Sequence, residues 1–320
     1  MAAIRIGANF WNQYTTWPAL LEAGIRADHL GYDTLWTWDH LYPIVGDSHG
    51  DNFEGWLTIT AWAARTERIR IGLLVGANPY REPTLVAKMA TTLDHISNGR
   101  AILGIGAAWN DEEADAFGFA FGSGMPERLR WLGEALPLMR GMLDGHEPDA
   151  LGPRYVAKGA RNLPGPMQRR LPILIGGMGE RVTLRLVARF ADMNNLGGGD
   201  IERVRAREHI LVGHCEAIGR DPAEIERTAS VGTIFIRDRR ADAERVGRTA
   251  FEQNRATPWY PHYGSPEQIA DELAPFLELG YRHLIANFPA PYDVESVTRF
   301  ATEVRTLLET VGSADGARFR

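Results

Sequence analysis

The stretch Arg68-Ile-Arg-Ile-Gly-Leu-Leu-Val75, followed by a segment from Glu82 to Gly99 and then by Ala101-Ile-Leu-Gly-Ile-Gly-Ala107, decides the fold class. Both apolar runs are short and lack polar alternation, which is typical of parallel strands that are buried on both faces. The segment between them begins with Glu82 and Pro83, ends at Gly99, and repeats apolar residues with a period near 3.6. The pattern predicts a strand, a crossover helix and a parallel strand.

Similar apolar runs recur along the whole chain. We count eight, at Ile4–Asn9, Thr34–Trp38, Ile69–Val75, Ala101–Ala107, Pro172–Gly176, Asp192–Leu196, Val231–Ile236 and His283–Phe288. Helix signals lie between them: Thr16 and Pro18 begin one helix that Gly31 ends, and Asp271–Leu279 is a helical stretch that Gly280 ends. Eight strands that alternate with helices predict an α/β protein, a closed (β/α)8 TIM barrel.

The stretch Asp111–Arg170 is longer than one crossover helix needs. It contains a predicted helix over Glu127–Leu143 and then a loop rich in proline and glycine, so we expect an insertion after the fourth strand that lies over the barrel mouth. The remaining sequence has no composition break and no repeat. We therefore expect a single barrel domain over residues 1–310 and a frayed tail over 311–320.

Composition narrows the classes of partner. The chain has 320 residues, of which 44% are hydrophobic, and a net charge of −6 without any basic run, which disfavours nucleic acid and anionic membranes as partners. The single cysteine excludes an internal disulfide, and no apolar run is long enough for a membrane span. We expect no leader segment and a cytoplasmic protein. Because Lys88 and Lys158 are the only lysines, an anion site must use arginine, backbone N–H groups or helix ends.

In a (β/α)8 barrel the active site lies where the strands end. Six of these ends carry Asn9-Phe-Trp11, Trp38-Asp-His40, Gly76-Ala-Asn78, Ala107-Ala-Trp-Asn110, Gly176-Gly-Met-Gly-Glu-Arg181 and Asn287-Phe288. Aromatic, amide and glycine residues dominate, and serine is absent. This set is poor for hydrolysis and suits a flat heterocycle, because aromatics flank a ring and amides bind its polar edge. No His-x-His pair ends the first strand, so we expect no metal site.

The chemistry of three of these positions stays open from the residues alone. His40 is either a proton donor or acceptor beside a redox ring, or a structural histidine that bonds a carbonyl group. Asp39 either orients a ring edge or caps the loop that follows it. The run Gly176–Gly179 precedes a helix that we expect to begin near Arg181, and it is either a phosphate-binding loop or a simple left-handed turn.

The sequence resembles the luciferase-like monooxygenase superfamily, and in particular its coenzyme F420-dependent oxidoreductases. The resemblance covers nearly the whole chain, from Ile4 to Thr310. The stretches that carry it are Ala27–His40, Arg68–Val75, Leu85–Arg100, Leu103–Asn110, Leu171–Glu180 and Gly264–Ala270.

The resemblance implies a site, residue by residue. His40 corresponds to a functional histidine, and Leu74–Val75 to a bulge with a non-prolyl cis peptide that backs the cofactor ring. Asp39, Asn78 and the residues along the ring edge and the phosphate would contact the cofactor. The cofactor-binding residues that we predict are Asp39, Leu74, Val75, Asn78, Gly106, Ala107, Asn110, Gly176, Gly177, Met178 and Gly179. Some relatives carry a glutamate where this chain has Ala107 and Ala108, so that acid is missing here.

We therefore predict hydride transfer between a deazaflavin, coenzyme F420, and a small organic substrate, with His40 as the catalytic proton carrier. The alternatives are an FMN-dependent monooxygenase supplied by a separate flavin reductase, and a non-catalytic flavin-binding protein. The resemblance also implies a homodimer. The residues predicted to line an apolar or aromatic substrate pocket, unless they are core packing, are Trp11, Trp38, Tyr42, Trp109 and Trp259.

Overall fold

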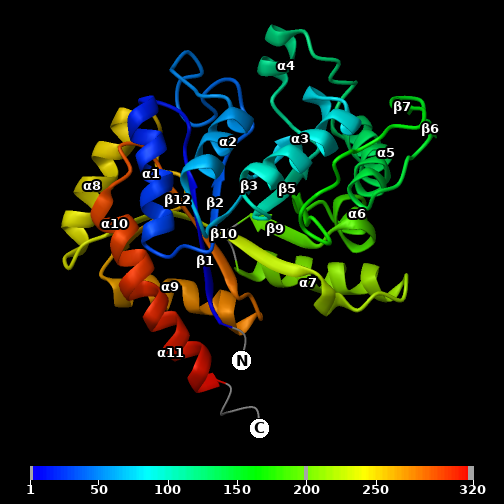
Figure 1. Cartoon of the computed structure of the whole chain (residues 1–320). Coiled ribbons are helices and arrows are strands. Elements are labelled where there is room, and N and C mark those ends of the chain that lie inside the picture. Colours follow the sequence, from blue (N-terminus) through cyan, green and yellow to red (C-terminus); the bar gives the residue numbers. More distant parts are fainter. Residues whose placement is uncertain (1–2, 198–200, 316–320) are drawn as a thin grey trace.

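The computed structural model describes residues 3–197 and 201–315. Within these ranges, eight parallel strands pair in a closed ring in the order β1, β2, β3, β5, β8, β9, β10, β12 and back to β1. Their bounds are β1 Arg5–Phe10, β2 Thr34–Thr37, β3 Arg70–Leu73, β5 Ala101–Gly106, β8 Ile173–Gly176, β9 Met193–Gly197, β10 Glu226–Ile236 and β12 His283–Phe288. The predicted (β/α)8 barrel is confirmed (Figure 1).

Helices surround the barrel (Figure 1). The longer ones are α1 Trp17–His29, α2 Gly55–Arg65, α3 Pro83–Ile96, α5 Met125–Leu143, α6 Thr183–Phe190, α7 Ile201–Glu216, α8 Arg240–Gln253, α9 Pro266–Glu278 and α11 Arg305–Asp315. Shorter elements are α4 Asp111–Phe117, α10 Val294–Arg299, η1 Asn78–Tyr80, η2 Pro222–Glu224 and η3 Phe300–Val304. No helix in the described ranges combines the length and the apolar character that crossing a bilayer requires.

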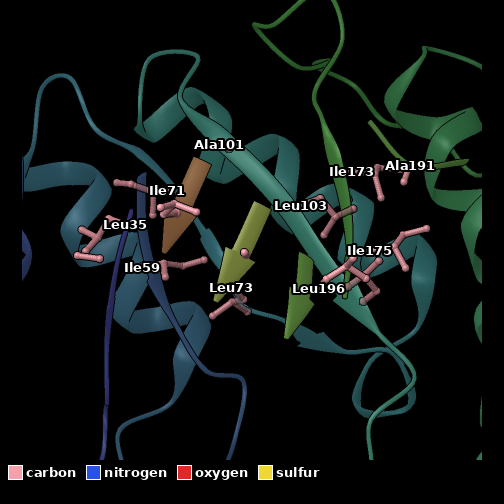
Figure 2. Close-up of a cluster of buried hydrophobic side chains, with 14 of the residues drawn as sticks. Leu35, Ile59, Ile71, Leu73, Ala101, Leu103, Ile173, Ile175, Ala191 and Leu196 are labelled. Atoms are coloured by element: carbon pink, nitrogen blue, oxygen red, sulfur yellow. The ribbon is translucent and has the colours of Figure 1, made fainter. Parts of the chain in front are cut away.

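Alternate residues of several strands belong to two separate hydrophobic layers. Leu35, Leu103 and Ile173 pack with helix residues such as Ile59 in the layer between the strands and the helices (Figure 2). Their neighbours along the strands form a second cluster that includes Trp36, the largest side chain among them. Because successive strand residues point to opposite faces, this second cluster fills the interior of the barrel.

Two elements differ from the sequence prediction near the C-terminal half. Strand β10 begins at Glu226 rather than at Val231, because its first residues are polar side chains such as Thr228 that are buried inside the protein and break the apolar pattern. Helix α9 begins at Pro266 rather than at Asp271, because the Ser265 hydroxyl and the Gln268 side chain form a capping box. An additional strand, β11 Pro261–Gly264, pairs with the end of β10.

The segment after β5 holds more structure than one crossover helix. It contains α4, which was not predicted, then α5, and then the two-stranded hairpin of β6 Ala150–Leu151 and β7 Val156–Ala157. Helix α5 packs against α3 and α6, so it takes the place of the crossover helix. Figure 1 shows α4 above the end of the barrel that lies opposite the N terminus. The insertion that we propose over the mouth therefore consists of α4 and the loops beside α5.

The C-terminal helix α11 continues to Asp315, past the predicted domain boundary at residue 310. The rest of the predicted tail, residues 316–320, lies outside the described residues. The single domain over residues 1–310 stays a proposal.

Candidate active site

The third barrel strand is interrupted at its carboxyl end. Strand β3 pairs with the first half of β5, and the short strand β4 Gly76–Ala77 pairs with the second half. Between them lies the peptide bond Leu74–Val75, which is cis. The predicted non-prolyl cis peptide is thus confirmed, and it places Leu74 and Val75 against the cluster inside the barrel.

The side chain of Val75 lies over the ends of two neighbouring strands, and both strands have glycine there. A Cβ atom on Gly106 would lie 2.8 Å from Val75 Cγ2, and one on Gly176 would lie 2.9 Å from Val75 Cγ1. Real Cβ atoms essentially never approach so closely. Gly106 and Gly176 therefore make room for Val75, a role that the sequence did not indicate.

This packing gives a first testable prediction. We expect Gly176→Ala to lower the free energy of unfolding by about 1–3 kcal/mol, the usual cost of overpacking, because the new methyl group displaces Val75. In a Val75→Ala background the same substitution should cost much less, since the clashing methyl groups are gone. Urea unfolding of the two single variants and the double variant measures this coupling.

A matched control is Gly133→Ala, in the middle of α5, where the added Cβ meets its nearest neighbour, Leu186, at 3.6 Å, an ordinary contact. It should leave stability unchanged or raise it by up to about 1 kcal/mol through helix propensity. Equal costs of Gly176→Ala in the wild-type and Val75→Ala backgrounds would contradict the proposed packing of Val75 against Gly176.

Asp39 is buried at the end of β2 and is only partly satisfied. Its Oδ2 accepts hydrogen bonds from the backbone N–H of Ala77 (2.8 Å) and from Arg81 Nη1 (2.7 Å), and Arg81 also bonds Glu54. Its Oδ1 is buried and has no partner among the described residues. The carboxylate thus fixes the start of the β4 segment and keeps one acceptor for a further donor.

His40 is held by a side chain that the sequence analysis did not identify. Its Nδ1 lies 2.8 Å from Oε2 of Glu113, a residue of α4. The Oε1 atom of Glu113 accepts the backbone N–H groups of Leu41 (2.6 Å) and Tyr42 (2.8 Å), and the Tyr80 hydroxyl donates to Oε2 (2.7 Å). The structural alternative for His40 was a bond to a carbonyl group, and the observed partner is a carboxylate instead.

The environment keeps Glu113 ionised. Its side chain is 0% exposed, and this burial opposes the charge. The hydrogen bonds from His40, Tyr42 and Tyr80 outweigh burial and hold the pKa of Glu113 below its ordinary value. Burial and the neighbouring Glu113 carboxylate raise the pKa of Tyr80 well above its usual range. Tyr80 therefore donates, and a carboxylate without a proton can only accept, so Nδ1 of His40 carries a proton.

The other imidazole nitrogen, Nε2 of His40, has no hydrogen-bond partner in the described part of the chain. The imidazole side chain is 13% exposed. It lies 5.4 Å, between ring centroids, from the indole of Trp109, which is 54% exposed. One nitrogen is thus fixed by the protein and the other is left for a bound molecule.

Glu113 could have been found from one local signal. Asn110 lies at the N-cap of α4, where its side chain accepts from the backbone N–H of Glu113, and three acidic residues follow it. Asparagine followed at the third position by glutamate is a helix-start pattern. This pattern would have predicted that Glu113 lies on a helix that follows the fourth strand in the sequence, but not that it contacts His40.

Other predicted cofactor residues are used within the protein. The buried amide of Asn78 donates to the Tyr155 hydroxyl (2.9 Å), and Asn110 caps α4. Ala107 is half-buried against the main core, while the next residue, Ala108, adopts a left-handed backbone with φ +63°.

The loop Gly176–Gly179 joins β8 to α6. Gly177 has φ +116°, and its N–H donates to the carbonyl of Asn195 (3.2 Å). The carbonyl group of Met178 accepts from Arg207 Nε (3.2 Å). Helix α6 begins at Thr183, later than predicted, and the glycines lie ahead of it as expected. The left-handed turn is therefore present, and phosphate binding by the loop stays a proposal.

The predicted substrate-pocket residues form two groups. Trp11, Trp38 and Trp259 pack together, with ring centroids 5.1 Å apart for the first two and 6.2–6.4 Å from Trp259. Trp11 is buried against Phe251, which is core packing, whereas Trp259 is 37% exposed. In the second group the ring of Trp109 lies near His40, tilted by 60° from the imidazole. The backbone N–H of Tyr42 donates to Glu113, and its ring contacts Phe117.

Two cavities lie elsewhere. One, of about 310 Å³, is lined by α8 residues, Pro258 and Tyr263, and the other, of about 180 Å³, lies between α1 and the segment around Tyr292. Neither is lined by any predicted site residue. The donors and acceptors of the candidate site converge at the strand ends instead. In the described residues no group of three His, Cys, Asp or Glu side chains could hold a metal ion.

The protein is a closed (β/α)8 barrel with a cis peptide between β3 and β4 and a hydrogen-bonded histidine at its mouth. The chain belongs to the luciferase-like monooxygenase family, whose model matches residues 5–274. It is similar to an F420-dependent glucose-6-phosphate dehydrogenase of Microbacterium testaceum, at 27% identity over 89% of this chain and 91% of that protein.

Two further likenesses come from different kinds of enzyme. A 4-hydroxyprotoasukamycin monooxygenase of Streptomyces nodosus is 33% identical, over 40% of this chain and 32% of that protein. The solved structure of an F420-dependent secondary alcohol dehydrogenase with an F420–acetone adduct has a TM-score of 0.83 at 19% identity, and it covers 96% of this chain and 99% of that one. The structural likeness supports the fold alone.

Proposed function

We propose that this protein is an F420-dependent oxidoreductase that transfers a hydride between the deazaflavin and a small organic substrate. His40 carries the accompanying proton. The observation that supports this most directly is the imidazole at the barrel mouth, with Nδ1 bound to Glu113 and Nε2 without a partner in the described part of the chain. A group of this kind suits proton transfer near neutral pH.

The residues at the mouth fit a flat ring with polar edges. Asp39 Oδ1 is a buried acceptor without a donor, and an N–H or O–H group on a ring edge would satisfy it. Leu74 and Val75 present an apolar surface that is backed by the glycines of the next strands. When bound, the deazaflavin supplies hydride transfer. The chain binds and orients the reactants, excludes water and moves the proton.

The choice of F420 over FMN is supported by how far the likenesses extend. The relative named as F420-dependent matches 89% of this chain, whereas the named monooxygenase matches 40%. An FMN-dependent monooxygenase, which would work with a separate flavin reductase, is the alternative.

A side-by-side titration tests the cofactor. Trp38 and Trp109 lie at the mouth, so a bound ring should quench tryptophan fluorescence. We expect F420 to bind more tightly than FMN, and reduced F420 to be consumed only when a substrate is present. Equal or reversed affinities would favour the monooxygenase, and tight binding without turnover on any substrate would favour the non-catalytic flavin-binding protein.

The proposal also covers the substrate and partners. The exposed parts of Trp109 and Trp259 favour an apolar or aromatic small molecule. Lys88, one of the two lysines, donates to the carbonyl of Leu163, so this hydrogen bond within the protein already engages its ammonium group. A homodimer and a cytoplasmic location belong to the same proposal and rest on the resemblance and on the composition.

A further inference from the structure

We propose that Glu113 is a positioning residue that fixes the tautomer of His40, so that Nε2 is the atom that accepts and returns the proton. This inference rests on the proposed function, because it specifies how the proton carrier of that reaction works. It concerns a residue that touches neither substrate nor cofactor and acts only through the imidazole.

Four groups approach the two oxygens of Glu113. On Oε1 these are the backbone N–H groups of Leu41 and Tyr42, which can only donate. On Oε2 they are the Tyr80 hydroxyl and His40 Nδ1, which can each exchange the role of donor for that of acceptor.

In the wild type the carboxylate accepts all four bonds. A neutral His40 must then carry its single proton on Nδ1, which leaves a lone pair on Nε2. Asp39, the preceding residue, is bound to Arg81, and Glu113 lies on the opposite edge of the ring. No protein group in the described ranges competes for the lone pair.

Replacing Glu113 by glutamine should reverse this arrangement. The amide oxygen must face the two backbone N–H groups, because those cannot accept, so the amide NH2 faces Tyr80 and His40. Tyr80 can turn its hydroxyl and accept. His40 can accept only if Nδ1 loses its proton, and the neutral ring then carries its proton on Nε2. Nε2 can no longer take up a proton from the substrate.

The chain contains a matched control at the other end of the barrel. Glu226 Oε1 lies 2.7 Å from His283 Nδ1, and this histidine is completely buried. Its Nε2 lies 2.8 Å from the hydroxyl of Thr34, which accepts the indole N–H of Trp36. The Oε2 atom of Glu226 accepts from Arg5 Nη1 (3.0 Å), so glutamine at position 226 disturbs this buried network and leaves the contacts of His40 unchanged.

The experiment uses nitrogen-15 NMR of the cofactor-free full-length protein labelled in histidine, at pH ~8.5, about two units above the ordinary imidazole pKa. His40→Ala identifies the His40 signals by their loss. We expect His40 to carry its proton on Nδ1 in the wild type and on Nε2 in Glu113→Gln. Single-turnover rates with bound F420 should fall by about 10²–10⁴-fold in Glu113→Gln, the usual value of one proton carrier.

The controls separate positioning from general loss of stability. Glu226→Gln should lower the melting temperature while the His40 signals and the rate per bound cofactor stay as in the wild type. Glu113→Asp keeps an acceptor-only carboxylate, so it should keep the proton on Nδ1 and retain a higher rate than Glu113→Gln. If the glutamine protein does not fold, the wild-type spectrum still tests the inference, because a proton on Nε2 of wild-type His40 would overturn it.

Three results would overturn the inference. These are a wild-type His40 with its proton on Nε2, an unchanged tautomer in Glu113→Gln, and a rate loss in Glu113→Gln no greater than in Glu226→Gln. The NMR signals need no cofactor, so a protein that does not use F420 would fail in the rate assay and still report the tautomer. Failure of this inference and failure of the proposed function are thereby distinguishable.

Discussion

In the His40→Ala variant, the single-turnover rate with bound F420 should fall by about 10²–10⁴-fold while the cofactor dissociation constant stays nearly unchanged. The imidazole lies at the mouth of the barrel, and its Nε2 has no partner among the described residues, so the substitution removes the proposed proton carrier. The acceptor that we assign to the cofactor edge, Asp39 Oδ1, belongs to a separate network with Ala77 and Arg81 and should remain in place.

The variant also leaves Glu113 with fewer donors. Leu41, Tyr42 and Tyr80 continue to hold the carboxylate, so we expect a moderate drop in melting temperature and a folded protein. Melting temperature, cofactor dissociation constant and single-turnover rate are measured on the same preparation. A histidine that only supports the structure would show the opposite result: stability and cofactor affinity would fall together, and the rate per bound cofactor would hardly change.

The barrel itself could be predicted because most of its strands are buried on both faces by apolar residues. The prediction failed locally where the interior is polar. Thr228, at 0% exposure, lies in the part of β10 that the apolar pattern missed. Its hydroxyl and that of Ser230 bond the side chain of Asn195 on β9, a pairing that periodicity along one strand does not reveal.

A single residue of the candidate site could be predicted from its place in the sequence, whereas a contact between two distant residues could not. His40 was identified from its place after a strand. Glu113 was not, because the two residues are separated by 73 positions and meet only when α4 folds over the barrel end. The missing acid at Ala107 and Ala108 therefore does not leave His40 without a carboxylate; this carboxylate comes from the next helix.

Two glycines of the candidate site show a second limit of prediction from the sequence. Gly106 and Gly176 were predicted to lie along a cofactor, and the structure shows that each is required by the side chain of Val75. A glycine in a sequence indicates that something approaches closely, but it does not indicate whether that is a ligand or another part of the chain.

The buried pair at the opposite end of the barrel should have the largest effect on stability. His283 begins β12, pairs with Arg5 at the start of β1, and is 0% exposed. Its two nitrogens bond Glu226 (2.7 Å) and Thr34 (2.8 Å). In His283→Ala the Thr34 hydroxyl and one side of the Glu226 carboxylate lose their partner beside a new cavity. We expect the free energy of unfolding to fall by about 3 kcal/mol or more.

The pH dependence supplies a second signature of the same residue. Burial lowers the pKa of His283, and the hydrogen bond to Glu226 only partly opposes this. The unfolded chain therefore binds the proton first, and wild-type stability falls as the pH decreases through the ordinary histidine value of about 6.5. That contribution, at most ~1.4 kcal/mol per pH unit, should be missing in His283→Ala, so the two stability curves approach each other between pH ~7.5 and ~5.5.

Urea unfolding at several pH values measures both quantities, and His49→Ala provides the control, because that side chain is 87% exposed. The control should follow the wild type at each pH. Since His283 lies at the end of the barrel opposite His40, the rate per bound cofactor should be retained in His283→Ala at neutral pH. A stability loss below about 1 kcal/mol, or parallel curves for wild type and His283→Ala, would show that the protein tolerates a charged or absent imidazole at this position. The buried network of Glu226, His283 and Thr34 would then contribute little to the stability of the protein.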